Sequence, residues 1–342
     1  MIRRPGLLDL LAAGIFLAGF AAPAMAAPRM FLLAGPVNEL QAQMARDIAA
    51  EIAPAADLAL QVEPSLGAVD SLLRLQHETG SHLMLMPGDL ITAYRQAAVH
   101  GHAKAADFAG SIRLIAPLHY ESFYFVVRVG SSMTRLQDLR EARINLGPLK
   151  GNTALSVNQL FQRLFGVAIT DSRAAHFANE EALVHLISDK TIDAVALVAP
   201  EPAHLLAEMK SDARRYVKLL RFDPASVGSD NLLDTYVAAT AHAASYPSLL
   251  GEDIPVLAVP IWLVAVGKPG VEVDRRLDAL SQAWCKIAVR MKDEGKSGWR
   301  DVATALPPVP GGAIFVSSDT SELLKCMPAP IPAMVSPEKG KQ

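Results

Sequence analysis

The sequence predicts an α/β protein made of two domains, and three observations lead to this prediction. Short β-rich apolar runs alternate with amphipathic helical stretches from Arg29 onward, a pattern typical of largely parallel sheets covered by helices. At 342 residues the chain is longer than one hydrophobic core usually supports. Two apolar runs, 112–117 and 123–129, flank the polar trio 119–121, and such a pair can carry a chain from one lobe to the other.

Hydrophobic periodicity predicts the individual elements in order. The first strand is expected at 30–34, and the helix after it, 39–52, places Leu40, Met44 and Ile48 along one side. Further strands are expected at 58–62, 82–86, 112–117, 123–129, 144–147, 192–198, 216–220 and 256–266. Further helices are expected at 69–77, 153–165, 180–187 and 275–291.

The two domains are expected to be interleaved along the chain, because no low-complexity linker separates them. Residues 27–119 together with 222–326 form the first lobe in this prediction, and residues 120–221 form the second. The proline-rich C-terminal part ends in a polar tail, 327–342, which we expect to be mobile.

The N-terminus has the pattern of a secretory signal peptide. Arg3 and Arg4 precede an apolar run from 7 to 22, and the small residues Ala24 and Ala26 suit the pocket of signal peptidase. We expect residues 1–26 to be removed by a cut after Ala26, which places the protein in a periplasm. An uncleaved membrane anchor and a twin-arginine signal are the alternatives.

The chain has two cysteines, Cys285 and Cys326, both in its C-terminal part. In an oxidising compartment they predict one disulfide, which pins the C-terminal tail to the helix that carries Cys285. Two buried thiols or a reactive cysteine are the alternatives.

No pattern in the chain predicts catalysis. A nucleophile elbow, a His-Glu-x-x-His helix and a dinucleotide fingerprint are all missing from the sequence. His100 and His102 are spaced in a way that matches no zinc signature, so we expect loop histidines, no metal and no cofactor. A net charge of −3 with few clustered basic residues argues against nucleic-acid binding. The sequence therefore predicts a protein that is not an enzyme.

The segment 145–153, NLGPLKGNT, is the most informative loop, because a strand enters it and an amphipathic helix leaves it. Backbone amides at the start of a helix lack intrahelical partners and carry partial positive charge, which suits a carboxylate or another oxyanion. Gly151 allows close approach, Asn152 or Thr153 can cap the helix or bond a ligand, and Lys150 adds a full charge. Ordinary capping without a ligand is the alternative.

Five short segments occur in a recognisable order: VEPSLGAV at 62–69, IRLIAPLHYE at 112–121, VVR at 126–128, NLGPLKGNT at 145–153 and KTIDAV at 190–195. Together they resemble the TAXI family, the solute receptors of one class of tripartite ATP-independent periplasmic (TRAP) transporters. The resemblance covers roughly residues 58–270, and the set of segments is specific although each alone is weak.

The resemblance implies a type II periplasmic-binding fold, in which a ligand is held between two α/β lobes. It also implies small carboxylate or amino-acid-like solutes, and separate TRAP membrane subunits as partners. The cleft would be lined at strand ends and helix starts, where α/β folds bind ligands. Carried over by position, the ligand-binding residues would be Asn38, Ser65, Gly67, Asp89, Tyr120, Glu121, Lys150, Gly151, Asn152, Thr153, Pro200 and Glu201.

The first turn, 34–39, departs from the family pattern, since it has one glycine and lacks the usual tyrosines. A receptor-like interaction or sensory protein that has lost transport is therefore the alternative function. Asp89, Glu121 and Glu201 would favour an amino or other cationic group if they face the cleft, and solvated loop acids are the alternative for these three.

Overall fold

The structure is a computed structural model, and it describes residues 29–37, 39–75, 81–149, 151–226, 228–268 and 270–327. The expected signal peptide, the mobile tail after Met327, and the predicted site residues Asn38 and Lys150 lie outside the described residues. None of the helices in the described ranges has the length and hydrophobicity needed to span a membrane.

One mixed sheet runs through the protein, with the strand order β2-β1-β3-β10-β4-β7-β5-β6. At one end β1 (Arg29–Ala34) pairs in parallel with β2 (Ala59–Pro64) and β3 (Ser81–Pro87). At the other end β5 (Ile144–Asn145) pairs in parallel with β6 (Ala174–Ala175) and β7 (Ala194–Ala199). These two parallel sets confirm the predicted α/β class.

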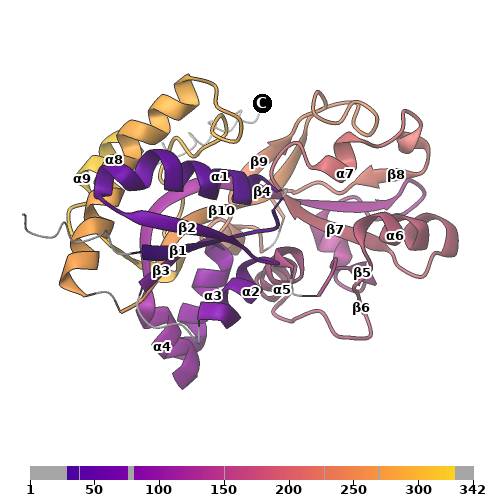
Figure 1. Ribbon diagram of the computed structural model, residues 1–342. Coiled ribbons are helices and arrows are strands. Elements are labelled where there is room, and N and C mark those ends of the chain that lie inside the picture. The colour runs from indigo at the N-terminus through magenta and orange to yellow at the C-terminus, as the bar shows by residue number, and fades with distance from the viewer. Residues whose placement is uncertain are drawn as a thin grey trace, which may run out of the picture.

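Two long antiparallel strands, β4 (Ile112–Arg128) and β10 (Ile254–Gly267), join the two parallel sets (Figure 1). Three shorter strands pair with them: β8 (Val217–Leu219) and β11 (Ile314–Phe315) with β4, and β9 (Val237–Ala241) with β10. The chain therefore crosses between the two halves within continuous strands, and the halves are two ends of one sheet.

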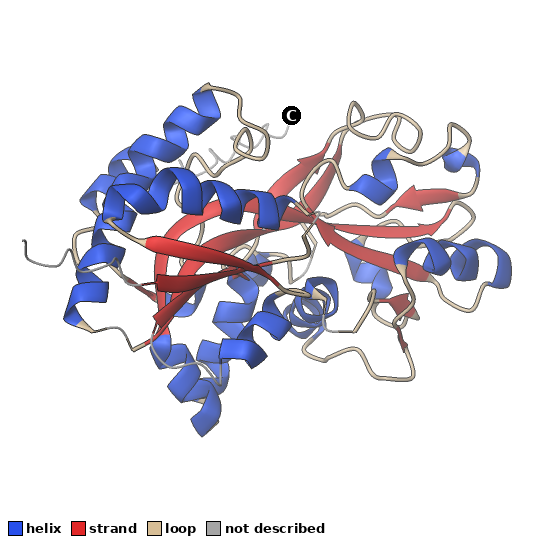
Figure 2. Ribbon diagram, viewed as in Figure 1, coloured by secondary structure: helices blue, strands red, loops and turns tan. Residues whose placement is uncertain are grey.

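Helices lie on both sides of this sheet (Figure 2). The half that contains β1 carries most of the long ones, and α8 follows β10 back along it. The helices are α1 (Leu40–Asp47), α2 (Ala68–Leu75), α3 (Gly88–Val99), α4 (Ala103–Ser111), α5 (Asn152–Phe165), α6 (Asn179–Val184), α7 (His204–Ala207), α8 (Val271–Asp293) and α9 (Ser321–Cys326).

The prediction of two separate strands at 112–117 and 123–129 is wrong, because β4 continues through His119, Tyr120 and Glu121. The register of β4 against β10 shifts between Pro260 and Trp262, where a β-bulge accommodates the chain. Bulges are where a central strand tolerates proline, so Pro117 and Pro260 do not end the strands. The polar trio lies within the sheet, and Glu121 is bonded across to α1.

The segment 88–111 forms α3 and α4, which the sequence analysis did not predict. Pro87 is both the last residue of β3 and the N-cap of α3, with Gly88 as the first helical residue. His100 and His102 lie in the turn between the two helices, as expected for loop histidines.

The hydrophobic core does not divide at the join between the halves. One cluster of buried side chains runs from Leu32 of β1 through Phe125 of β4 to Ala196 of β7, and it includes Trp284 of α8. A second cluster lies within the far half, where it gathers Leu186, Leu197 and residues of the segment 241–256. The far half thus receives chain from the segment before β10 as well as from 120–221.

Cys285 of α8 and Cys326 of α9 form a disulfide, with their Cα atoms 5.7 Å apart. It joins the two cysteines that the sequence predicts as a pair, across 41 positions of the chain. The bond fixes the last described helix to the long helix α8.

Candidate functional site

The predicted site residues that the structure describes come from the ends of strands at the join between the halves. Ser65 and Gly67 follow β2, Asp89 follows β3, and Pro200 follows β7. These are carboxyl ends of parallel strands, the edge at which open α/β sheets bind ligands. The two halves meet there directly, because the start of α5 contacts the start of α2.

This meeting of α2 and α5 is a close one. Asn152 Oδ1 accepts a hydrogen bond from the backbone N–H of Ala68 at 2.7 Å. A Cβ atom on Gly67 would lie only 2.7 Å from the same oxygen, and the φ angle of Gly67, 134°, is one that L residues rarely adopt. Glycine is therefore required at position 67 for the approach of α5.

The start of α5 leaves backbone donors without a side-chain cap. The first-turn amides of any helix have no intrahelical acceptor. In α5 the N-cap residue is Gly151, which has no side chain to accept from them. Thr153 Oγ1 is used elsewhere, since it accepts the N–H of Val198 at 3.3 Å. We call Gly67, Ala68, Gly151, Asn152 and Thr153 the helix-start contact.

Ser65 is occupied within its own half. Its hydroxyl donates to the Ala34 carbonyl and accepts from the Ser71 hydroxyl at 2.8 Å. Ser65 therefore organises the turn between β2 and α2, and it presents no unused donor to the join.

Asp89 is buried in the first turn of α3, with 1% of its surface exposed. The Tyr236 hydroxyl donates to its Oδ2 over a long 3.4 Å, and its Oδ1 has no hydrogen-bond partner among the described residues. Burial raises the pKa of the Asp89 carboxyl from 3.8 to about 6, and Glu121 adds to this, while the Ser156 hydroxyl and the Leu90 amide oppose it. The carboxylate form is therefore costly at this position.

Glu121 is the second buried acid, with 4% exposed. Its Oε1 accepts from Gln41 Nε2 at 2.6 Å and lies 3.6 Å from Nε2 of the buried His119. Because Asp89 and Glu121 are both buried, solvated loop acids do not describe them. We call Gln41, Asp89, His119, Glu121 and Tyr236 the acid cluster.

Tyr120, Pro200 and Glu201 are half-buried at the same join. Tyr120 pairs with Pro260 in the sheet, and desolvation raises the pKa of its phenol. Glu201 accepts from the N–H of His242 at 2.9 Å and lies 3.1 Å from Nδ1 of that residue. This pairing attaches the loop after β7 to the end of β9.

Sequence reasoning missed Gln41, His119, Ser156, Tyr236 and Trp262 as members of the site. Two of them had a usable signal: Ser156 is four positions after Asn152 and so shares its helix face, and His119 shares a strand face with Glu121. Tyr236 and Trp262 carry no local signal, since contacts between distant segments bring them to Asp89 and Gly88.

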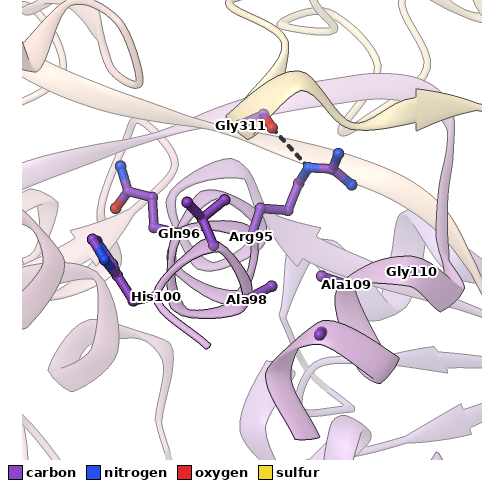
Figure 3. A pocket seen from close by; sticks show the side chains of 9 residues that line it. Arg95, Gln96, Ala98, His100, Ala109, Gly110 and Gly311 are labelled. Atoms are coloured by element: carbon purple, nitrogen blue, oxygen red, sulfur yellow. Dashed lines mark hydrogen bonds between the residues drawn. The ribbon is translucent and has the colours of Figure 1, made fainter. Parts of the chain in front are cut away.

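A hollow of about 490 Å³ lies elsewhere, between α3, α4 and the turn at Gly311. Figure 3 shows Arg95 reaching across it to donate from Nε to the Gly311 carbonyl at 2.7 Å. None of the predicted site residues lines this hollow. Among the residues that the structure places, no three His, Cys, Asp or Glu side chains are grouped so as to hold a metal ion.

Comparison with protein families matches residues 39–268 to the NMT1-like family. The chain belongs to the NMT1-like family. Of the predicted site residues, Asn38 alone lies outside the part of the chain that matches. The disulfide and helices α8 and α9 lie after the matched part of the chain.

Solved structures of binding proteins are similar to this NMT1-like chain at low identity. A TctC solute-binding protein from Polaromonas is 15% identical, with 81% of this chain and 88% of that chain covered and a TM-score of 0.45. MatC from Rhodopseudomonas palustris, with bound malate, is 19% identical, with 80% and 86% covered and a TM-score of 0.41. An ancestral arginine-binding protein bound to arginine is 15% identical, with 80% and 96% covered and a TM-score of 0.43. A search of curated proteins found no match.

Proposed function

We propose that this NMT1-like protein is a periplasmic receptor that captures a small carboxylate or amino-acid-like solute between its two halves. It would deliver that solute to the membrane subunits of a TRAP-type transporter of the TAXI class. In this proposal residues 27–119 and 222–326 belong mainly to one lobe and residues 120–221 to the other, with β4 and β10 passing between them.

The observation that carries the proposal is the meeting of helix starts from both halves. The starts of α2 and α3 belong to one half and the start of α5 to the other. Asn152 bonds the Ala68 amide across the join, and Ser156 of α5 adjoins Asp89 of α3. Helix starts attract anions, so a carboxylate between them would be bound by both halves at once.

Such a ligand would change the balance between open and closed arrangements. A solute that touches both halves binds the closed arrangement better than the open one, and this difference in affinity shifts the population. A membrane partner can then distinguish loaded receptor from empty receptor by shape. No catalytic step is needed for this role.

Thermal unfolding against a library of carboxylates and amino acids tests the proposal. The protein is purified from a periplasm, unfolded and refolded to remove any ligand carried along, and then scanned with each compound. A true ligand at 100 times its Kd stabilises the folded state by about 2.7 kcal/mol, a shift of about 5 °C for a chain of this size. If no compound stabilises the refolded protein, the receptor function is contradicted.

Two observations favour the second candidate, a receptor-like interaction or sensory protein that has lost transport. Asn152 already fills the Ala68 donor, and a single hydrophobic cluster continues across the join. A chain that stays closed without ligand would show no stabilisation in the library scan. It would instead retain an envelope protein in a pull-down from periplasmic and membrane fractions.

A further inference from the structure

We propose that Asp89 and Glu121 form a subsite for a protonated amine, so that the solute carries an ammonium group as well as a carboxylate. This inference rests on the proposed function and narrows its substrate class. Three features of the acid cluster support it. The cluster lacks cationic partners, it contains buried polar atoms without hydrogen-bond partners, and it lies about one helical turn from the helix-start contact.

The acids of this cluster lack cationic partners within the described part of the chain. No Lys or Arg side chain of that part lies within ion-pairing distance of Asp89 or Glu121, and Glu121 has His119 alone nearby. Desolvation and the neighbouring Glu121 also raise the pKa of Glu39 at the start of α1. Burying carboxylates without a counter-charge is unfavourable, and a cationic ligand group would offset that penalty.

Unpaired buried atoms surround the same place. Asp89 Oδ1, both ring nitrogens of His119 and Trp262 Nε1 have no hydrogen-bond partner among the residues described, and each side chain is at least nine-tenths buried. Native proteins leave few buried polar atoms unpaired, so a group at this site points to a missing polar occupant. An ammonium group, with three donors, suits the carboxylate oxygens.

The distance between the two parts of the join fits one small molecule. Asn152 and Ser156 are four residues apart on the same face of α5, a rise of about 6 Å. Asn152 belongs to the helix-start contact, and Ser156 adjoins Asp89. A carboxylate at the helix starts and an ammonium at Asp89 are therefore about one helical turn apart.

Calorimetry with matched pairs of compounds tests the inference. Each amino acid is compared with the carboxylate that lacks only its amine, and the compounds are chosen so that the two groups can lie about one helical turn apart: glutamate with glutarate, 4-aminobutyrate with butyrate, 5-aminovalerate with valerate. We expect the wild-type protein to bind the amine-bearing member of the preferred pair more tightly by about 30-fold or more. Asp89→Asn and Glu121→Gln should each lower that preference by at least 10-fold.

Glu208→Gln is the matched control, because Glu208 is an exposed acid on the far half that pairs with His204. It should keep the full preference. The wild-type comparison needs no variant, so the test stands even if a substitution at Asp89 fails to fold. Equal or tighter binding of amine-free carboxylates overturns the subsite and leaves the receptor function intact. Absence of binding in both series overturns the receptor function, and the subsite with it.

Discussion

The helix-start contact and the acid cluster lie side by side at the join, yet their polar groups are treated differently. In the helix-start contact, Asn152 accepts the Ala68 amide across the join. Thr153 accepts the Val198 amide within its own half. In the acid cluster, Asp89 Oδ1 and the ring nitrogens of His119 are buried and have no hydrogen-bond partner among the described residues. The first region thus holds the halves together as they stand, whereas the second keeps buried polar atoms that the proposed ammonium group would pair.

The largest effect is expected from adding a side chain at Gly67, where α2 and α5 approach each other. Gly67→Ala places a Cβ 2.7 Å from Asn152 Oδ1 at a φ of 134°, which combines a steric clash with backbone strain. We expect a loss of about 3–4 kcal/mol in the free energy of unfolding, measured by denaturant titration.

Gly101→Ala separates the two causes. Gly101 also has a positive φ, 86°, but a Cβ there meets no atom within 4 Å, so only strain remains. Its cost should be about 1–2 kcal/mol. Equal losses for the two variants would mean that the contact with Asn152 contributes nothing.

A smaller effect is expected from the proton on Asp89. The folded state keeps this proton up to about pH 6, because burial raises the pKa of Asp89. In the unfolded chain the carboxyl is solvated, and its pKa is near 3.8. Between these values the folded state binds more protons than the unfolded state, so this group makes stability fall as pH rises. A shift of about two units corresponds to about 3 kcal/mol.

Asp89→Asn removes this titration, so the difference between wild-type and variant unfolding curves isolates it. Other acids, such as Asp193 with its pKa lowered to about 2 by Arg143, titrate alike in both proteins. Parallel curves from pH 3.5 to 7.5 would contradict a costly buried carboxylate. The bound amine proposed above should reverse the trend, because it favours the ionised form.

The smallest effect is expected from Asn152→Ala, which removes the hydrogen bond between the halves. The loss should be about 1–2 kcal/mol, since the amide of the buried Ala68 loses its acceptor. Asn158→Ala is the control on the same helix: it breaks bonds to Ala154 and Ile169 within one half. Both should lower stability, but only Asn152→Ala should alter the affinity for carboxylates. Identical affinities in the two variants would remove Asn152 from the site.

Local pattern was enough to predict α5 and the strand ends around it. The helix ends at Phe165 as predicted and begins at Asn152, one residue before the predicted start, with Gly151 as its N-cap in place of Asn152 or Thr153. The same reasoning failed at His119 to Glu121, because buried polar residues beside Pro117 have the composition of a turn. The hydrogen bond that Gln41 donates to Glu121 stabilises the buried carboxylate within the strand. Gln41 is 80 positions away, so no local pattern reveals this bond.

The acid cluster could be predicted only in part for a similar reason. Asp89 and Glu121 are expected at the site through the family resemblance, whereas Tyr236 is 147 positions from Asp89 and has no counterpart among the residues carried over. Nothing in the sequence near Tyr236 indicates that its hydroxyl reaches α3. The helices α3 and α4 were missed because alanines fill much of 93–109, so no clear apolar stripe marks a buried face.

Three prolines stand in neighbouring strands where the two halves of the sheet meet. Pro117 of β4 lies opposite Trp262, Pro260 of β10 opposite Tyr120, and Pro87 of β3 opposite Ile261. Proline has no N–H, so each of these positions lacks one cross-strand donor. Three backbone donors are thus absent where the two halves of the sheet meet. Twisting one half against the other along this line therefore breaks fewer backbone hydrogen bonds than the same motion along a line without prolines.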